Sequence, residues 1–279
     1  MFNDHDESHL ATTLITGHTG TIGRHFPRGY KRSNLDLLSV STTMGYKRDY
    51  LDATIIHMAG IVGPKSVGEN LEISERVNFT NTLEFAERCL EFGISKFLFT
   101  STSHVYKSSN TPLREEDVIE PQSLYAEQKI RAENALRELF LNSSAELTIS
   151  RIFSVLDWDC KDFTLGGSFR KIAEGDNKLF ISNGDDVRDF LTPETISNLL
   201  QKLAKKKNAF GIWNMCSGNA VSVREAANLM LGTIVGEKLT ELIHPGSSDN
   251  PYIVGDNHKI QNLLSDENFT WNPGEFNRG

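Results

Sequence analysis

Short runs of apolar and β-branched residues alternate along the chain with longer stretches in which apolar residues recur every three or four positions. The short runs predict strands at residues 11–16, 35–41, 53–59, 96–101, 147–155 and 178–182. The longer stretches predict helices at residues 69–92, 123–140, 169–173, 193–205 and 221–231. Strands that alternate with helices in this order predict a parallel sheet with right-handed crossovers. The expected fold class is therefore α/β.

A glycine-rich loop directly follows the first predicted strand. Gly17, Gly20 and Gly23 occupy its first, fourth and seventh positions, and Thr21 and Ile22 lie between the last two. Glycines at this spacing let the backbone turn tightly and approach a pyrophosphate at the amino end of the next helix. The loop is a spacing variant of the dinucleotide fingerprint and predicts a Rossmann-like, doubly wound sheet. A glycine-rich turn without a ligand is the alternative.

The end of the second predicted strand bears on the choice of dinucleotide. A Rossmann unit normally places an Asp or Glu there, on the adenosine ribose, but this chain has Ser41. A small hydroxyl tolerates a 2′-phosphate, and Lys47 and Arg48 are close enough in sequence to bind one, which favours NADP slightly over NAD. Solvated loop charges are the alternative for this basic pair. Few residues separate the second and third predicted strands, so a strand and helix are missing or compressed within residues 42–52.

Small and polar residues close the third predicted strand. His57, Ala59 and Gly60 stand where a cofactor would lie across the strand ends, and small residues allow that approach. Asn78, in the following helix, is either an ordinary polar helix residue or one that bridges two elements through a buried hydrogen bond.

Hydroxyl groups follow the strand predicted at residues 96–101. Thr102, Ser103 and His104 stand at its carboxyl end, which is the edge of a doubly wound sheet where ligands bind. We expect them to lie near the reacting groups, although such a cluster often only forms turns and caps.

A tyrosine and a lysine lie four residues apart in the helix predicted at residues 123–140. Residues at this spacing share one face of a helix, so Tyr125 and Lys129 can reach one ligand together. A free Tyr titrates near ~10 and a free Lys near ~10.4, but a cation beside the phenol favours the phenolate and lowers the pKa of the phenol. The pair therefore predicts a general acid or base, with an ordinary helix face as the alternative.

Composition narrows the class of partner. The chain has 279 residues, 38% of them hydrophobic and 24% charged, with a net charge of −8 at pH 7 and an isoelectric point near 5.5. Its basic residues are scattered, which argues against nucleic acid as the main partner. No apolar run is long enough to cross a bilayer, so no membrane partner is expected. Cys89, Cys160 and Cys216 are far apart, which argues against a metal site or disulfide framework and favours a reducing cytoplasm.

This length suits one large domain or two unequal lobes. We expect a dinucleotide-binding domain at residues 1–155 and a smaller mixed α/β substrate lobe at residues 156–279. Segments near residues 183–215 should return from the second part to the sheet.

Several motifs, in this order, resemble the extended short-chain dehydrogenase/reductase family, in its nucleotide-sugar epimerase/dehydratase branch. The strongest matches are residues 16–23, 57–60, 101–106 and 125–129. Further similar segments are residues 78–82, 188–191 and 213–218.

The resemblance implies a site that uses NAD or NADP on a nucleotide-diphospho-sugar. Tyr125 would be the catalytic acid or base, Lys129 its partner and a ribose ligand, and Thr102 the hydroxyl that bonds the substrate oxygen. Arg188 would contact the diphosphate, for which a guanidinium is apt. The alternative for Arg188 is a salt bridge with one of three nearby carboxylates, Asp185, Asp186 or Asp189.

Three functions follow from the resemblance, ranked here in order. The first is a nucleotide-sugar epimerase, the second an NADPH-dependent keto-sugar reductase, and the third a non-catalytic nucleotide-binding member of the fold. Dehydratases of this branch carry Asp-Glu directly after the threonine, whereas this chain has Ser103 and His104, which disfavours 4,6-dehydration. In the family the helix at residues 69–92 and the Tyr125 helix commonly form a dimer bundle, so the resemblance allows a homodimer.

Overall fold

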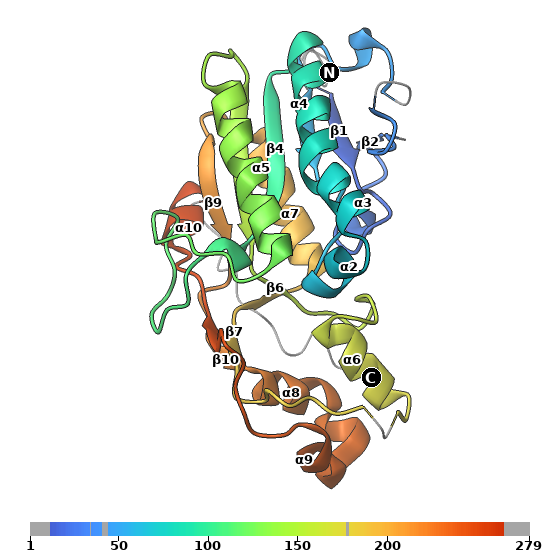
Figure 1. Cartoon of the computed structure of the whole chain (residues 1–279), viewed down its shortest axis with the longest axis vertical. Helices are drawn as coiled ribbons and strands as arrows, with labels where there is room; N and C mark the ends of the chain where they lie inside the picture. The colour runs from blue at the N-terminus through green and yellow to red at the C-terminus, as the bar shows by residue number, and fades with distance from the viewer. Residues whose placement is uncertain (1–11, 34, 41–43, 177–178, 265–279) are drawn as a thin grey trace, which may run out of the picture.

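A parallel sheet forms the centre of the larger of two lobes in the computed structural model, which describes residues 12–33, 35–40, 44–176 and 179–264 (Figure 1). The strand order is β2-β1-β3-β4-β5-β9, and every neighbouring pair is parallel. The strands are β2 (Lys31–Arg32), β1 (Thr13–Thr16), β3 (Thr54–His57), β4 (Lys96–Thr102), β5 (Glu146–Ile152) and β9 (Gly211–Met215). The predicted α/β class and doubly wound sheet are therefore confirmed.

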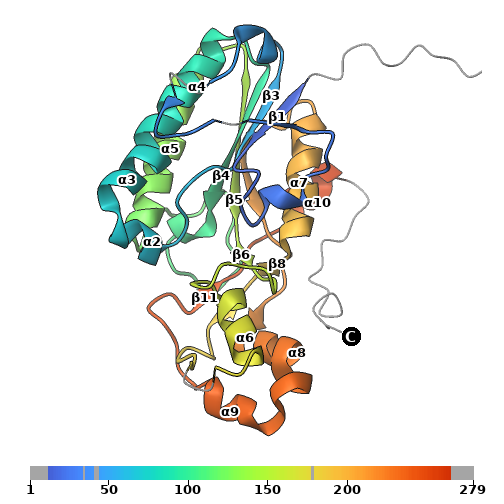
Figure 2. The ribbon, with the colours of Figure 1, turned by 90° about the vertical axis from the view of Figure 1, so that its right-hand side faces the viewer.

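Helices cover both faces of this sheet (Figure 2). One face carries α2 (Pro64–Glu69), α3 (Leu71–Glu75), α4 (Asn81–Glu91) and α5 (Leu124–Phe140), with a π-helical turn (Arg76–Thr80) joining α3 to α4. The other face carries α7 (Pro193–Lys205) and α10 (His258–Leu264).

The alternation of side chains along each strand divides the core into two halves. Ile55 and Phe97 pack under α4 and α5, while their neighbours Ile56 and Leu98 pack under α7, and all four side chains are fully buried. Strands buried on both faces read as continuous apolar runs, which is why the sequence predicts β3 and β4 well.

Helix α5 positions the predicted catalytic pair. Ser123 caps it by accepting a hydrogen bond from Ala126 N at 3.2 Å, so the helix starts directly after a serine, a residue favoured at this position. Its buried side chains then fall on the face toward β4 and β5. Tyr125 and Lys129 lie one turn apart in the first two turns.

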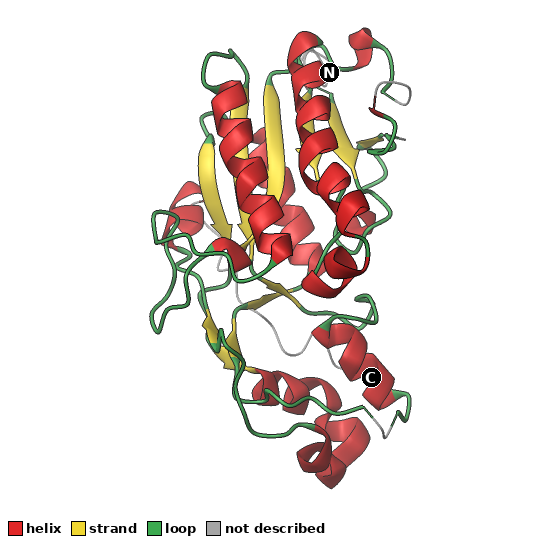
Figure 3. Cartoon of the chain, in the orientation of Figure 1, coloured by secondary structure: helices red, strands yellow, loops and turns green. Residues whose placement is uncertain are grey.

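The smaller lobe has its own sheets and core (Figure 3). Its strands are β7 (Val187–Arg188), β10 (Val221–Ser222) and β11 (Tyr252–Ile253) in one sheet, and β6 (Ser154–Val155) paired with β8 (Phe190–Leu191) in another. Its helices are α6 (Leu165–Ala173), α8 (Val223–Val235) and α9 (Leu239–Leu242). The division into residues 1–155 and 156–279 stays a proposal, because α7 and β9 come from the second part and pack in the larger lobe.

The second strand is not where the sequence predicts it. The predicted strand at residues 35–41 is wrong for its described part, since residues 35–40 contain no strand and β2 lies earlier, at Lys31–Arg32. Leu37 and Val40 are apolar because they pack into the core although neither is in a strand, with 6% and 2% of their surface exposed. Between residue 44 and β3 there is only a 3₁₀ turn (Lys47–Asp49), so the expected compression of this region is present in its described part.

Two further predictions differ from the structure. The strand expected at residues 178–182 is reduced, in its described part 179–182, to a single bridge between Ile181 and Ile243. Helix α6 starts four residues earlier than expected, because Gly166 and Gly167 pack against the backbone of residues 157–162, where any side chain would collide.

Among the described residues, no helix combines the length and the hydrophobicity that crossing a membrane requires.

Candidate functional site

The glycine loop packs tightly at the carboxyl end of β1. Gly17 has a φ of +71°, and a Cβ there would lie 2.7 Å from Ala59 N, so only glycine fits. Gly20 N donates to Gly17 O at 3.0 Å, and a Cβ on Gly23 would collide with the same oxygen. The loop leads into a single 3₁₀ turn (Gly23–His25) rather than a full helix.

The ends of β1 and β3 are joined by side-chain hydrogen bonds. Thr16 Oγ1 accepts from the backbone N–H of Met58 at 3.2 Å and of Ala59 at 3.3 Å. Thr21 and Ile22 of the loop, like Ala59, are partly exposed, and Ile22 also packs against the core under α7. The structure therefore brings the loop and Ala59 together at one edge of the sheet.

His57 is a core residue rather than a surface one. Its ring is fully buried against Phe85, Phe97 and Phe99, and burial lowers its pKa to about 3. Thr16 Oγ1 lies 2.9 Å from Nδ1 and Thr82 Oγ1 lies 3.2 Å from Nε2.

These contacts determine the His57 tautomer. Thr16 Oγ1 already accepts two backbone N–H groups, so its own proton is donated to His57 Nδ1. His57 Nε2 then carries the ring proton and donates to Thr82, which in turn donates to Val77 O at 2.9 Å. The His57 side chain thus has no polar atom left for a cofactor, and the residue can contact one only through its backbone.

Asn78 connects the loop after β3 to helix α5 through hydrogen bonds of its buried side chain, which is the second of the two roles that the sequence allows for it. Its amide exchanges two hydrogen bonds with the backbone of Ile61, at 2.8 and 2.9 Å, and donates to Gln128 of α5 at 2.9 Å. A Cβ placed on Gly60 would lie 3.1 Å from Asn78 Oδ1 and 3.7 Å from Lys129 Nζ. The loop after β3 therefore meets α5 at Lys129.

Tyr125 and Lys129 are both almost completely buried, with 8% and 4% of their surface exposed. Lys129 Nζ donates to Thr100 O of β4 at 2.9 Å and lies 4.6 Å from the centre of the Phe99 ring. Thr100 is two residues before Thr102, so this contact fixes the height of α5 relative to the end of β4.

Burial dominates the titration of this pair. It raises the pKa of the Tyr125 phenol, which is the opposite of the direction expected from a neighbouring ammonium. The reason is geometric, because the Lys129 ammonium is directed to Thr100 O and Phe99. Burial lowers the pKa of Lys129 to about 8, and the charge of Glu133 works against that decrease.

Thr102, Ser103 and His104 lie at the end of β4 as expected. Thr102 Oγ1 accepts from His104 N at 3.3 Å, which caps a short 3₁₀ turn (Ser103–Val105). Ser103 is 98% buried, and its hydroxyl has no hydrogen-bond partner among the described residues. Desolvation and the charge of Arg188 lower the pKa of His104 to about 4, although its side chain is exposed.

Arg188 forms the salt bridge that the sequence leaves as its alternative role. Its guanidinium donates to Asp186 Oδ2 at 2.7 Å and to the backbone oxygens of Val187 and Pro251 at 2.9 and 3.1 Å. Its side chain keeps 13% of its surface exposed. The described structure places Arg188 in the smaller lobe, where its charge acts on His104.

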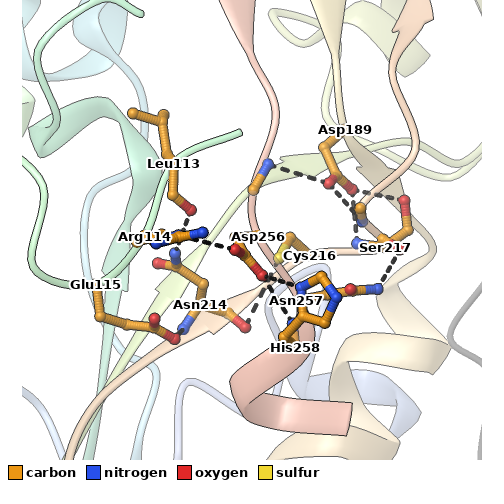
Figure 4. A network of polar contacts seen from close by, with 12 residues as sticks. Leu113, Arg114, Glu115, Asp189, Asn214, Cys216, Ser217, Asp256, Asn257 and His258 are labelled. Carbon is orange, nitrogen blue, oxygen red and sulfur yellow. Dashed lines mark hydrogen bonds and ion pairs between the residues drawn. The ribbon is translucent and has the colours of Figure 1, made fainter. Parts of the chain in front are cut away.

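Two polar clusters near the site escape sequence reasoning. One joins Glu133 of α5 to Arg151 of β5, with Arg151 Nη2 donating to Glu133 Oε2 at 2.7 Å. The other surrounds Asp189, which accepts hydrogen bonds from Ser217 and from the backbone after β9 and β11 (Figure 4). The spacing of α5 could have indicated Glu133, because it lies one turn beyond Lys129 on the same helix face. Nothing in the local sequence indicates that Asp189 contacts residues 217–255.

The described surface has two hollows beside the polar network drawn in Figure 4. Two adjoining cavities of about 330 and 400 Å³ share Arg114 and Asp256 in their walls, and no predicted site residue lines either of them. Within the described residues, no cluster of three His, Cys, Asp or Glu side chains is arranged to hold a metal ion. Ser41, predicted to contact the cofactor, lies outside the described residues.

Comparisons with known proteins place this geometry in a family. The chain is 25% identical to the GDP-6-deoxy-D-mannose reductase of Pseudomonas aeruginosa over 80% of this chain and 74% of the relative. Its fold matches the UDP-glucuronic acid 4-epimerase of Bacillus cereus in complex with UDP-glucuronic acid and NAD, with a TM-score of 0.80, 19% identity and coverage of 94% and 95% of the two chains. It also matches RMD of Pseudomonas aeruginosa complexed with NADPH, with a TM-score of 0.77, 20% identity and the same coverage. The sequence model of the NAD dependent epimerase/dehydratase family matches residues 13–216, and the chain belongs to this family.

Proposed function

We propose that the chain is an NAD(P)-dependent epimerase of nucleotide-diphospho-sugars, with Tyr125 as its proton-transfer residue. The observation that carries the proposal is the meeting of three elements at Lys129. The loop after β3 reaches Lys129 at Gly60, the end of β4 reaches it through Thr100 O, and Tyr125 lies one helical turn before it. The relatives named above, a reductase of a GDP-sugar and an epimerase of a UDP-sugar, support this substrate class.

The residues of this edge fit a dinucleotide. Gly17 and Gly23 allow a turn in which no side chain intervenes, and Ala59 and Gly60 are small and partly exposed beside it. The buried hydroxyl of Ser103, next to Thr102, has no partner among the described residues, and a buried polar atom without a partner is consistent with a nearby ligand site. Gly17, Gly20 and Gly23 would hold the pyrophosphate, and Lys129 the ribose next to the nicotinamide.

The chain's own contribution is the proton. A bound nicotinamide supplies the hydride acceptor and donor. Tyr125 takes the proton from a sugar hydroxyl and returns it, and the Thr102 hydroxyl bonds the same oxygen. Burial raises the pKa of the phenol, so the free protein holds Tyr125 in the form that donates the proton in the reductive half of the cycle. The oxidative half requires that Tyr125 first release its proton to solvent and act as the phenolate.

The epimerase and reductase alternatives differ in their need for a reductant. An epimerase recycles its hydride, so the purified protein should carry bound nicotinamide nucleotide and interconvert sugar nucleotides without added NADPH. A keto-sugar reductase should consume NADPH stoichiometrically, which the loss of reduced-nicotinamide absorbance measures. Activity only with added NADPH would replace the first proposal with the second.

The end of β2 supports NADP as the cofactor, at a different position from the one the sequence suggests. Strand β2 ends at Arg32, and Ser33 N donates to Ile15 O at 2.9 Å, so Arg32 and Ser33 lie beside the start of the glycine loop. Neither is acidic, and the exposed Arg32 guanidinium makes only a long contact, 3.5 Å, to Phe26 O among the described residues. We assign the 2′-phosphate to Arg32 rather than to Lys47 or Arg48.

Replacing Arg32 with alanine should weaken NADPH binding by about 10- to 100-fold, the range that a charged hydrogen bond to phosphate contributes. NADH binding should change little, because NADH has no 2′-phosphate. Dissociation constants of both cofactors measured by calorimetry on the purified protein test this.

Lys31→Ala is the matched control, because Lys31 Nζ is already paired with Asp49 at 2.7 Å. An equal loss of affinity for both cofactors in Arg32→Ala would contradict the assignment.

A homodimer also stays a proposal. Helices α4 and α5 pack side by side on one face of the sheet, and α3 on that face exposes Leu71 and Ile73 by 51% and 43%. Light scattering on the purified protein measures its mass in solution directly.

A further inference from the structure

Glu133 is a buried carboxylate one helical turn beyond Lys129. It is 1% exposed and accepts four hydrogen bonds from side chains of two strands. From β5, Arg151 Nε donates to both oxygens at 3.2 Å and Nη2 donates to Oε2 at 2.7 Å. From β4, Ser101 Oγ donates to Oε1.

The contact with Ser101 connects Glu133 to the end of β4. Ser101 lies between Thr100, whose carbonyl oxygen holds Lys129 Nζ, and Thr102, the proposed partner of the substrate oxygen. Glu133 and Lys129 lie on consecutive turns of α5, and they hydrogen bond to consecutive residues of β4, Ser101 and Thr100. Any shift of this carboxylate moves the strand end and the lysine relative to each other.

Stability alone is a weak reason for such a group. Removing two charges from water costs free energy that a buried ion pair recovers only partly, and apolar pairs of similar volume are often as stable. Here the guanidinium of Arg151 also lies 4.6 Å from the centre of the Tyr106 ring and donates to Glu115 O at 3.1 Å. The pair is thus fully bonded. Its anionic member, Glu133, is on the same helix as Lys129 and one turn from it, and its charge favours the ammonium form of Lys129 while the cation Arg151 partly offsets that effect.

The groups facing Lys129 come from three elements. Helix α5 contributes Tyr125, which burial keeps neutral, and the anion Glu133. Strand β3 contributes His57, which burial keeps neutral, and the π-helical turn contributes the uncharged Asn78. Of these, Glu133 is the group that favours the ammonium form of Lys129.

We propose that Glu133 is a positioning residue of the active site, which keeps Lys129 charged and holds the end of β4 beside it. It acts through Lys129 and Ser101 and does not contact the substrate. The inference rests on the proposed function for its catalytic consequence, but its electrostatic part can be measured without any turnover.

The test uses Glu133→Gln together with the double variant Glu133→Gln/Arg151→Met in the full chain. The amide keeps the shape of the carboxylate and removes its charge, which leaves Arg151 buried and unpaired and should lower the melting temperature. The double variant removes that unpaired charge and should recover most of the loss. NMR titration of isotope-labelled lysine, with the Lys129 signal assigned by its absence in Lys129→Arg, reports the Lys129 pKa directly.

In Glu133→Gln the pKa of Lys129 should fall by about one unit or more, the effect of losing a nearby opposite charge. In the double variant, which also removes the cation of Arg151, the fall should be smaller. The alkaline limb of kcat/KM for the sugar nucleotide should move to lower pH by the same amount. An unchanged Lys129 titration in folded Glu133→Gln, or a larger fall in the double variant than in the single one, would overturn the inference and leave Glu133 a structural residue. A shifted titration in a protein that turns over no sugar nucleotide would uphold the inference and refute the proposed function instead.

Discussion

Replacing Tyr125 with phenylalanine is expected to lower kcat for nucleotide-sugar turnover by about 10²- to 10⁴-fold, the contribution usual for a positioned general acid or base. Burial alone shifts the pKa of the Tyr125 hydroxyl, with no hydrogen bond from a described residue contributing, so its removal should leave the melting temperature nearly unchanged. Steady-state kinetics and thermal unfolding of the same preparation measure both quantities. Substrate affinity should change far less than kcat, because the proton moves only in the chemical step.

Tyr106 offers a matched control from the same region. It too is buried, with 1% of its surface exposed, but its hydroxyl donates to Asn214 Oδ1 at 2.6 Å. Tyr106→Phe should therefore show the reverse pattern, with a loss of about 1–3 kcal/mol in the free energy of unfolding and little loss of turnover. If Tyr125→Phe turned over substrate at the original rate, the chain would fit the third hypothesis, a non-catalytic nucleotide-binding member of the fold.

The parts of the fold that the sequence predicts are those in which local pattern and tertiary packing agree. Helix α7 has the predicted bounds, Pro193–Lys205, because Pro193 at its first turn and the apolar spacing act together. Strand β2 was missed because its two residues, Lys31 and Arg32, are exposed and carry no apolar signal. An edge strand of this kind is defined by its pairing with β1 and not by its own side chains.

The candidate site also has features that the sequence predicts and features that it does not. Spacing on one helix is enough to place Tyr125 and Lys129 together, and strand order is enough to place Thr102 near them. The direction of the Tyr125 pKa was not predictable, because it depends on burial and on where the Lys129 ammonium points. Of the three carboxylates expected as alternatives for Arg188, the structure pairs it with Asp186, and the hydrogen bonds of Asp189 to residues 217–255 were not foreseen.

The Asp189 cluster leads to an expected pH dependence of stability that is unusual for an aspartate. Asp189 is fully buried, and its hydrogen-bond donors are all uncharged: Ser217 N, Ser217 Oγ, Gly218 N and Gly255 N. Burial outweighs these bonds and raises the pKa of Asp189 to about 6. Asp186, equally buried, also has the Arg188 guanidinium, and its hydrogen bonds and that charge outweigh burial and lower its pKa.

The sign follows from proton counting. In the unfolded chain Asp189 titrates near ~3.9, so between about pH 4 and pH 6 the folded state holds a proton that the unfolded state has released. The free energy of unfolding that this proton supplies is fully present below about pH 4 and is lost as the pH rises through 6. The shift of about two units corresponds to about 2–3 kcal/mol.

Urea unfolding of the original protein and of Asp189→Asn across pH 4–7 isolates this effect, because asparagine does not titrate. The difference in the free energy of unfolding between the two proteins should decrease by about 2–3 kcal/mol as the pH rises from 4 to above 6. Asp186→Asn is the control of opposite sign, because the stability that Asp186 supplies is present above its unfolded pKa and is lost as the pH falls. A pH-independent difference for Asp189→Asn would mean that water reaches this carboxylate. In that case the segments after β9 and β11 would separate from it in solution, and this part of the structure would be more open than described above.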